Sequence, residues 1–130
     1  MKLKFLCTLA LLLTSLALSA QNAIDKAVDE YSSIGKSTFT SAVERDPNTR
    51  KVLKVVKVLQ PTDITINRLR RAFLEEQKNG QFSLVTNEEE ETMTLTIENS
   101  KENRVYMMQY MHRGASFSDG KVTIIIKYKQ

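Results

Sequence analysis

The sequence predicts an α+β fold: one antiparallel sheet, made of a hairpin plus three to four further strands, with two helices packed on one face. Three observations predict it. Two segments carry apolar residues at helical spacing, most of the other segments are rich in β-branched residues, and the links between them are short. Short links favour antiparallel neighbours, and runs of strand set apart from the helices are typical of the α+β class.

Residues 1–20, MKLKFLCTLALLLTSLALSA, are expected to be an export signal that is cleaved after Ala20. Two lysines precede an apolar run and small residues follow it, which is the pattern of a secretory signal. The run has about 14 residues, fewer than the roughly 20 that a membrane-spanning helix needs, although a retained membrane anchor is the rival interpretation. The only cysteine, Cys7, lies inside the signal, so the mature protein is expected to carry neither a lipid nor a disulfide.

Residues 21–130 are enough for a single α+β domain and too few for two. The chain has 19 basic and 15 acidic side chains, and two of its lysines belong to the signal, which leaves 17 basic ones and a net charge of +2. The mature chain has no long basic cluster, so we expect no nucleic-acid partner. Because residues 21–130 contain no cysteine, the burial of apolar side chains alone must hold the core together.

Residues 22–35 are expected to form the first helix, with Asn22 as its cap and Gly35 at its end. Its apolar residues recur at helical spacing: Ile24, Ala27, Val28 and Tyr31.

Residues 62–80 are expected to form the main helix, capped by Asp63 or Thr65 and ended by Asn79 and Gly80. Its apolar face is Ile66, Leu69 and Phe73.

The remaining segments are expected to be strands. Residues 36–43 and 51–59 flank an Asp-Pro-Asn turn and predict a hairpin. Residues 82–86 form a short strand, and residues 91–98 alternate cleanly, with Met93, Leu95 and Ile97 on one face and Thr94, Thr96 and Glu98 on the other. Residues 104–112 return along the sheet, 113–120 are expected to be a loop, and the last strand turns Val122, Ile124, Ile126 and Tyr128 to one face.

The stretch GKST at residues 35–38 resembles the end of a phosphate-binding loop. That loop needs an earlier glycine and lies between a strand and a following helix. Here Glu30 occupies the position of that glycine, and a helix precedes the stretch while a strand follows it. We therefore expect no nucleotide cofactor.

His112, the only histidine, lies near Ser116, Ser118 and Asp119, which are the residue types of a hydrolase triad. Closeness in sequence does not show that a fold brings them together, and Ser, Gly and Asp are ordinary turn residues. An exposed histidine at a strand end is the better interpretation, so no catalytic residue is assigned.

Two further segments suggest metal sites. The acidic segment NEEEET would point its carboxylates to alternate sides of an extended strand, so they could not converge on calcium. The segment MMQYMH combines methionine with histidine, but Met108 and His112 would lie about 13 Å apart along a strand. Core filling is the usual role of methionine, and we expect no metal ligand.

One surface is expected to take part in recognition. If Val105, Met107 and Met111 faced the core, the opposite face of the strand would carry tyrosine and histidine beside threonines of the preceding strand. Tyrosine offers a large contact area at low entropy cost. The candidate partner-binding face is Tyr106, Tyr110, His112, Thr94 and Thr96. The alternative is that the two tyrosines are buried in the core.

The signal ending LSAQ, the short helix IDKAVDEY, the early hairpin and the strand-rich end together resemble small exported domains of unknown function from Gram-negative anaerobic bacteria. The resemblance implies a periplasmic or secreted α+β domain and no particular activity. We therefore expect a non-enzymatic domain that binds a protein or a glycan in the cell envelope. The alternatives are a small periplasmic hydrolase or other enzyme, and a cystatin-like inhibitor, since those inhibitors also lay a helix on an antiparallel sheet.

Overall fold

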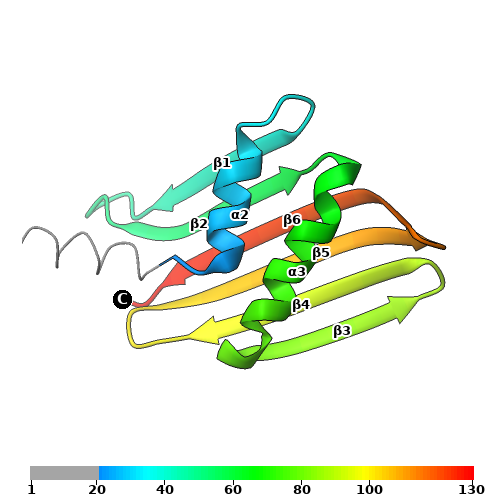
Figure 1. Ribbon diagram of the computed structural model, residues 1–130. Helices are drawn as coiled ribbons and strands as arrows, with labels where there is room; N and C mark the ends of the chain where they lie inside the picture. Colours follow the sequence, from blue (N-terminus) through cyan, green and yellow to red (C-terminus); the bar gives the residue numbers. More distant parts are fainter. Residues whose placement is uncertain (1–20) are drawn as a thin grey trace, which may run out of the picture.

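The computed structural model describes residues 21–130, which form a six-stranded antiparallel sheet with two helices against one face (Figure 1). The predicted α+β fold class, with an antiparallel sheet, is therefore confirmed. The predicted signal at residues 1–20 lies outside the described residues. The elements are α2 (Ala23–Ser32), β1 (Thr38–Arg45), β2 (Val52–Gln60), α3 (Ile66–Glu76), β3 (Gln81–Asn87), β4 (Glu90–Glu98), β5 (Glu102–Arg113) and β6 (Ser116–Tyr128).

The strand order β1-β2-β6-β5-β4-β3 joins two parts of the chain through its last strand. Strand β6 lies between the early hairpin β1–β2 and the later strands β5, β4 and β3. Helix α3 carries the chain from β2 to the far edge of the sheet, where β3 begins (Figure 1). At that edge Gly80 is required, because a Cβ there would come within 2.3 Å of the Thr96 carbonyl oxygen.

Helix α2 begins with a capping box, in which Asn22 and Asp25 each accept a hydrogen bond from the other's backbone N–H. The predicted apolar face is confirmed, since Ile24, Val28 and Tyr31 are buried. The predicted end at Gly35 is wrong: the helix ends at Ser32.

The residue after Gly35, Lys36, takes the left-handed conformation with a φ of 73°. The chain therefore turns toward β1 at a residue other than the glycine.

Helix α3 also buries its predicted face, because Ile66, Leu69 and Phe73 have no exposed surface. A short 3₁₀ turn, Asp63–Thr65, precedes it, so the helical structure begins close to the expected position. The expected side-chain cap is absent at Thr65, whose hydroxyl donates to the Thr62 carbonyl oxygen at 2.8 Å instead. The first turn of α3 is thus continuous with the 3₁₀ turn and needs no separate cap.

The loop expected at residues 113–120 is in fact part of a long hairpin. Strands β5 and β6 pair up to Arg113 and Ser116, and the turn consists of Gly114 and Ala115. Farther along, the pairing shifts, and Asp119 takes a positive φ of 54°. The pair Asp119-Gly120, which suggests a turn in the sequence, therefore forms a bulge in β6. Gly120 packs closely against α3, since a Cβ at this position would lie 2.9 Å from the Ile66 side chain.

The hydrophobic core lies between the two helices and one face of the sheet, called here the covered face. The predicted alternation of β4 and of β6 is confirmed, because Met93 and Leu95 are fully buried and Val122, Ile124 and Ile126 nearly so. From the other strands the core takes Leu59, Tyr106, Met108 and Tyr110. Neither described helix is long and apolar enough to cross a membrane.

Candidate functional site

The five residues predicted to form a recognition surface do not share a face. Tyr106 and Tyr110 lie on the covered face with 0 % and 1 % of their surface exposed. Thr94 and Thr96 lie on the opposite face, paired with Met107 and Val105 of β5. The predicted grouping is therefore wrong, and so is the expectation that Val105, Met107 and Met111 face the core.

The tyrosines enter the core because their hydroxyl groups find polar partners there. The Tyr106 hydroxyl donates to Asp25 Oδ2 at 3.1 Å. The Tyr110 hydroxyl donates to Glu91 and accepts from Arg70 Nε at 2.9 Å. Buried tyrosine keeps its hydroxyl satisfied in this way and loses little by leaving water. The sequence pattern of β5 does not reveal these partners, because they come from α2, α3 and β4.

The first of these two polar groups links α2 to β5. Asp25 Oδ2 also accepts from the Arg104 guanidinium at 3.1 Å, and Arg104 Nε contacts Glu102 Oε1 at 2.5 Å. Burial opposes the charge of Arg104, but the bonds to Tyr106 and Glu102 outweigh it and raise its pKa above the ordinary value. Burial raises the pKa of Tyr106 to about 12. In this group the guanidinium of Arg104 pairs with the carboxylates of Asp25 and Glu102. These contacts hold α2 on the sheet.

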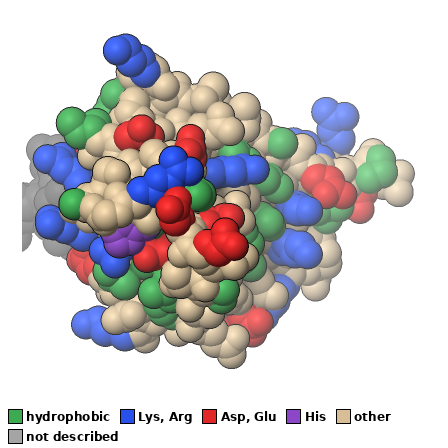
Figure 2. All heavy atoms as spheres, turned by 90° about the vertical axis from the view of Figure 1, so that its right-hand side faces the viewer, with side chains coloured by type: hydrophobic (Ala, Val, Ile, Leu, Met, Phe, Trp, Pro, Cys, Tyr) green, Lys and Arg blue, Asp and Glu red, His purple; other side chains and the backbone are tan. Residues whose placement is uncertain are grey.

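The second polar group lies at the β5–β6 end of the molecule (Figure 2). His112 Nδ1 lies 3.1 Å from Glu91 Oε1, and the histidine ring packs on Phe117 with centroids 4.6 Å apart. The Tyr110 hydroxyl lowers the pKa of Glu91 by hydrogen bonding, and this effect, helped by His112, outweighs the opposing effect of burial. Burial, followed by the bond to Glu91, raises the pKa of Tyr110 to about 12.

The structure pairs His112 with Glu91 and not with the nearby hydroxyl and carboxyl groups considered from the sequence. The Ser116 hydroxyl donates to the Arg113 carbonyl oxygen at 2.9 Å, and the Ser118 hydroxyl to Asp119 at 3.4 Å. Within residues 21–130, no three His, Cys, Asp or Glu side chains lie close enough together to hold a metal ion.

The second face of the sheet, called here the uncovered face, has no helix of residues 21–130 packed on it (Figure 1). Two rows of aliphatic, methionine and threonine side chains cross its middle, and the pairing register gives their members. One row is Ala42, Val56, Ile125, Val105 and Thr96. The next is Thr40, Val58, Thr123, Met107 and Thr94. On the four inner strands all of these are half-buried.

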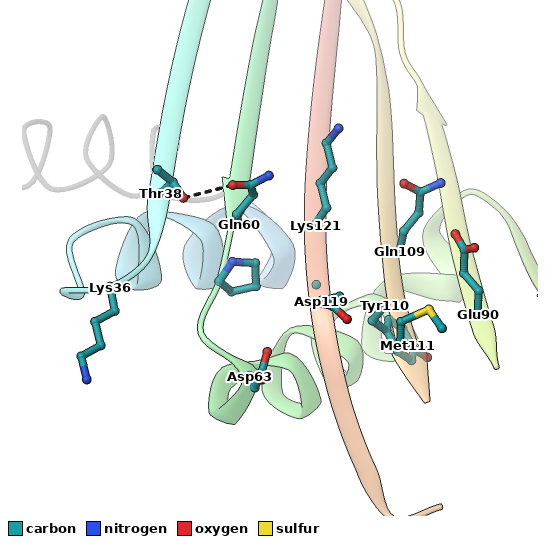
Figure 3. Close-up of a pocket in the computed structure, with 12 residues that line it drawn as sticks. Lys36, Thr38, Gln60, Asp63, Glu90, Gln109, Tyr110, Met111, Asp119 and Lys121 are labelled. Atoms are coloured by element: carbon teal, nitrogen blue, oxygen red, sulfur yellow. Dashed lines mark hydrogen bonds between the residues drawn. The ribbon is translucent and has the colours of Figure 1, made fainter. Parts of the chain in front are cut away.

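Charged and amide side chains border these rows at both ends of the strands. At one end Lys54, Lys127, Asn103 and Glu98 stand side by side on β2, β6, β5 and β4. At the other end an open cavity of about 580 Å³ runs across the ends of the strands (Figure 3). Gln60, Lys121, Gln109 and Glu90 line it from the same four strands. The uncovered face is thus an apolar centre with a polar rim.

Comparison with protein-family models, with curated proteins and with solved structures finds no match for this chain.

Proposed function

We propose that this protein is a non-enzymatic periplasmic or secreted domain that binds another protein through the uncovered face of its sheet. The observation that carries the proposal is the pair of rows of aliphatic, methionine and threonine side chains across four neighbouring strands, around Val56, Ile125, Val105 and Met107. A contiguous apolar patch with a polar rim on a small domain is typical of a protein interaction site.

The composition of this face favours a protein over a glycan. Sugars offer flat C–H faces that stack on aromatic rings, and the uncovered face presents aliphatic, methionine and threonine side chains instead. The aromatic residues of the strands belong to the covered side, where they form or pack against the core: Phe39, Phe82, Tyr106, Tyr110, Phe117 and Tyr128. Aliphatic and methionine side chains suit the apolar centre of a protein interface.

An enzyme is the weaker alternative. Its best candidate site is the group formed by Glu91, Tyr110 and His112, which contains an acid, a phenol and an imidazole in contact. A general acid or base works best with a pKa near the working pH. The hydrogen bond from Tyr110 lowers the pKa of Glu91, and burial raises the pKa of Tyr110 to about 12, so both move away from neutrality. These pairs therefore support a structural role.

Site-specific photocrosslinking in the producing cells tests the proposal. A benzophenone amino acid is placed at Met107 on the uncovered face and, as the control, at Leu84, which is 48 % exposed on the helix side of edge strand β3. We expect illumination to join the protein to one defined protein species from position 107 and not from position 84. Failure to crosslink from position 107, or equal yields from both positions, would contradict the proposal.

A further inference from the structure

We propose that the partner is a second copy of this chain, docked face to face about a two-fold axis parallel to the strands. This inference rests on the proposed function and names the occupant of the same surface. Two features of the described residues support it: the size of the face and the placement of its charges.

The face is large enough for a stable dimer. Six strands spaced by about 4.8 Å and seven residues per strand at about 3.3 Å give roughly 650 Å² per copy. Two copies would bury roughly 1,300 Å², which falls in the range of specific protein interfaces, about 1,200–2,000 Å². Sheets that pack face to face keep their strands within about 30° of each other, which suits a two-fold axis along the strands.

The charges of the rim are complementary under this axis. The rotation keeps each residue at its height along the strands and exchanges the two halves of the sheet, so β2 lies over β4 of the second copy and β6 over β5. In the row that contains Lys54, Lys127, Asn103 and Glu98, the rotation places Lys54 over Glu98 of the second copy. A two-fold axis perpendicular to the strands would instead place Lys127 over Lys121 of the second copy. The charges therefore select the axis.

The same rotation places Lys127 over Asn103 of the second copy, so neither lysine of this row meets a like charge. Near the axis, Ile125 would pack on Val105 of the second copy and provide the apolar centre.

The test is analytical ultracentrifugation of protein expressed from the full reading frame, at concentrations from about 1 to 300 µM, a range set to detect micromolar dissociation constants. We expect a reversible dimer. Ile125→Glu buries a charge at the centre of the interface and should weaken the dimer by at least about 30-fold. Thr123→Arg in the neighbouring row should also weaken it, and Leu84→Glu on the helix side should leave it unchanged. Circular dichroism checks that each variant is folded.

A charge exchange tests the axis itself. Lys54→Glu or Glu98→Lys should each weaken the dimer by about tenfold, because the pair occurs twice per dimer. The double variant should recover most of the lost affinity, since the two positions lie on strands β2 and β4, which are not neighbours within one copy. Single variants without effect, or a double variant that stays weak, would overturn the arrangement.

The remaining outcomes separate this inference from the proposed function. A monomer at every concentration, or a dimer that survives both Ile125→Glu and Thr123→Arg, overturns the second copy as partner. If position 107 still crosslinks to a different protein in cells, the uncovered face remains a binding surface for that protein. If neither dimer nor crosslink forms, both proposals fail.

Discussion

The two faces of the sheet are built by the same strands and differ sharply. On the covered face, tyrosine side chains are fully buried and bonded to charged residues of α2, α3 and β4. On the uncovered face, the neighbouring residues Val105 and Met107 have no helix of residues 21–130 above them and stay half-buried. Adjacent positions on β5 therefore have opposite roles. The comparison teaches that polar partners on other elements allow tyrosine side chains to fill the core side of β5.

The largest predicted effect is a difference in stability between variants at two neighbouring residues of β5. Tyr106→Ala should lower the free energy of unfolding by about 3–5 kcal/mol, because it removes a buried aromatic ring. The next residue offers the matched control: Met107→Ala should cost no more than about 1 kcal/mol, because its side chain faces away from the helices. Urea unfolding of both variants, at protein concentrations low enough to keep the protein monomeric, measures the difference. Equal costs at the two positions would show that the faces are assigned wrongly.

A smaller effect is expected from the polar group that joins α2 to the sheet. Asp25→Ala removes the acceptor that Tyr106 and Arg104 share. We expect a loss of about 2–3 kcal/mol, because Tyr106 and Arg104 are largely buried and each loses a hydrogen bond, while Arg104 keeps its bonds to Glu102 and Tyr106. Asp29→Ala on the exposed side of the same helix should cost less than about 0.5 kcal/mol. Similar losses from both variants, read from urea unfolding, would argue against the buried pair.

The buried tyrosines should also limit stability at high pH. Burial raises the pKa of Tyr106 and Tyr110 from 10.0 to about 12. The folded state therefore keeps protons that the unfolded state releases, so their contribution is complete below pH 10 and is lost as the pH rises toward 12. Absorbance at 295 nm should show two of the four tyrosines ionising late, and Tyr106→Phe should remove one of them. Ionisation of all four near pH 10 in folded protein would contradict the burial.

Much of the fold was predictable because it depends on local patterns. Strict alternation in β4 and helical spacing in α3 each specify one buried face, and both predictions are confirmed at Met93 and Leu69. The β5–β6 end was not predictable in the same way. Its Asp119-Gly120 pair is a frequent turn signal, yet tertiary packing of Gly120 against Ile66 makes it a bulge inside a hairpin.

The recognition surface was mispredicted because β5 carries large side chains on both of its faces. One side of the strand carries Val105 and Met107, and the other carries Tyr106 and Met108. The sequence alone therefore does not show which side faces the core. The hydroxyl partner of Tyr106 in the core, Asp25, lies 81 residues away in the chain, so the pattern of β5 does not reveal it. Only Thr94 and Thr96 of the expected surface lie on the uncovered face, because the alternation of β4 is unambiguous.

Oxidation of the methionines tests the central claim most directly, because the described residues contain two on each face. Met93 and Met108 are fully buried on the covered face, while Met107 and Met111 are half-buried on the other. Dilute peroxide converts accessible methionine to the sulfoxide, and peptide mass spectrometry measures each rate. We predict fast oxidation of Met107 and Met111, slow oxidation of Met93 and Met108, and protection of Met107 as protein concentration rises. Oxidation of Met108 as fast as Met107, or of Met107 at a rate independent of concentration, would contradict the account.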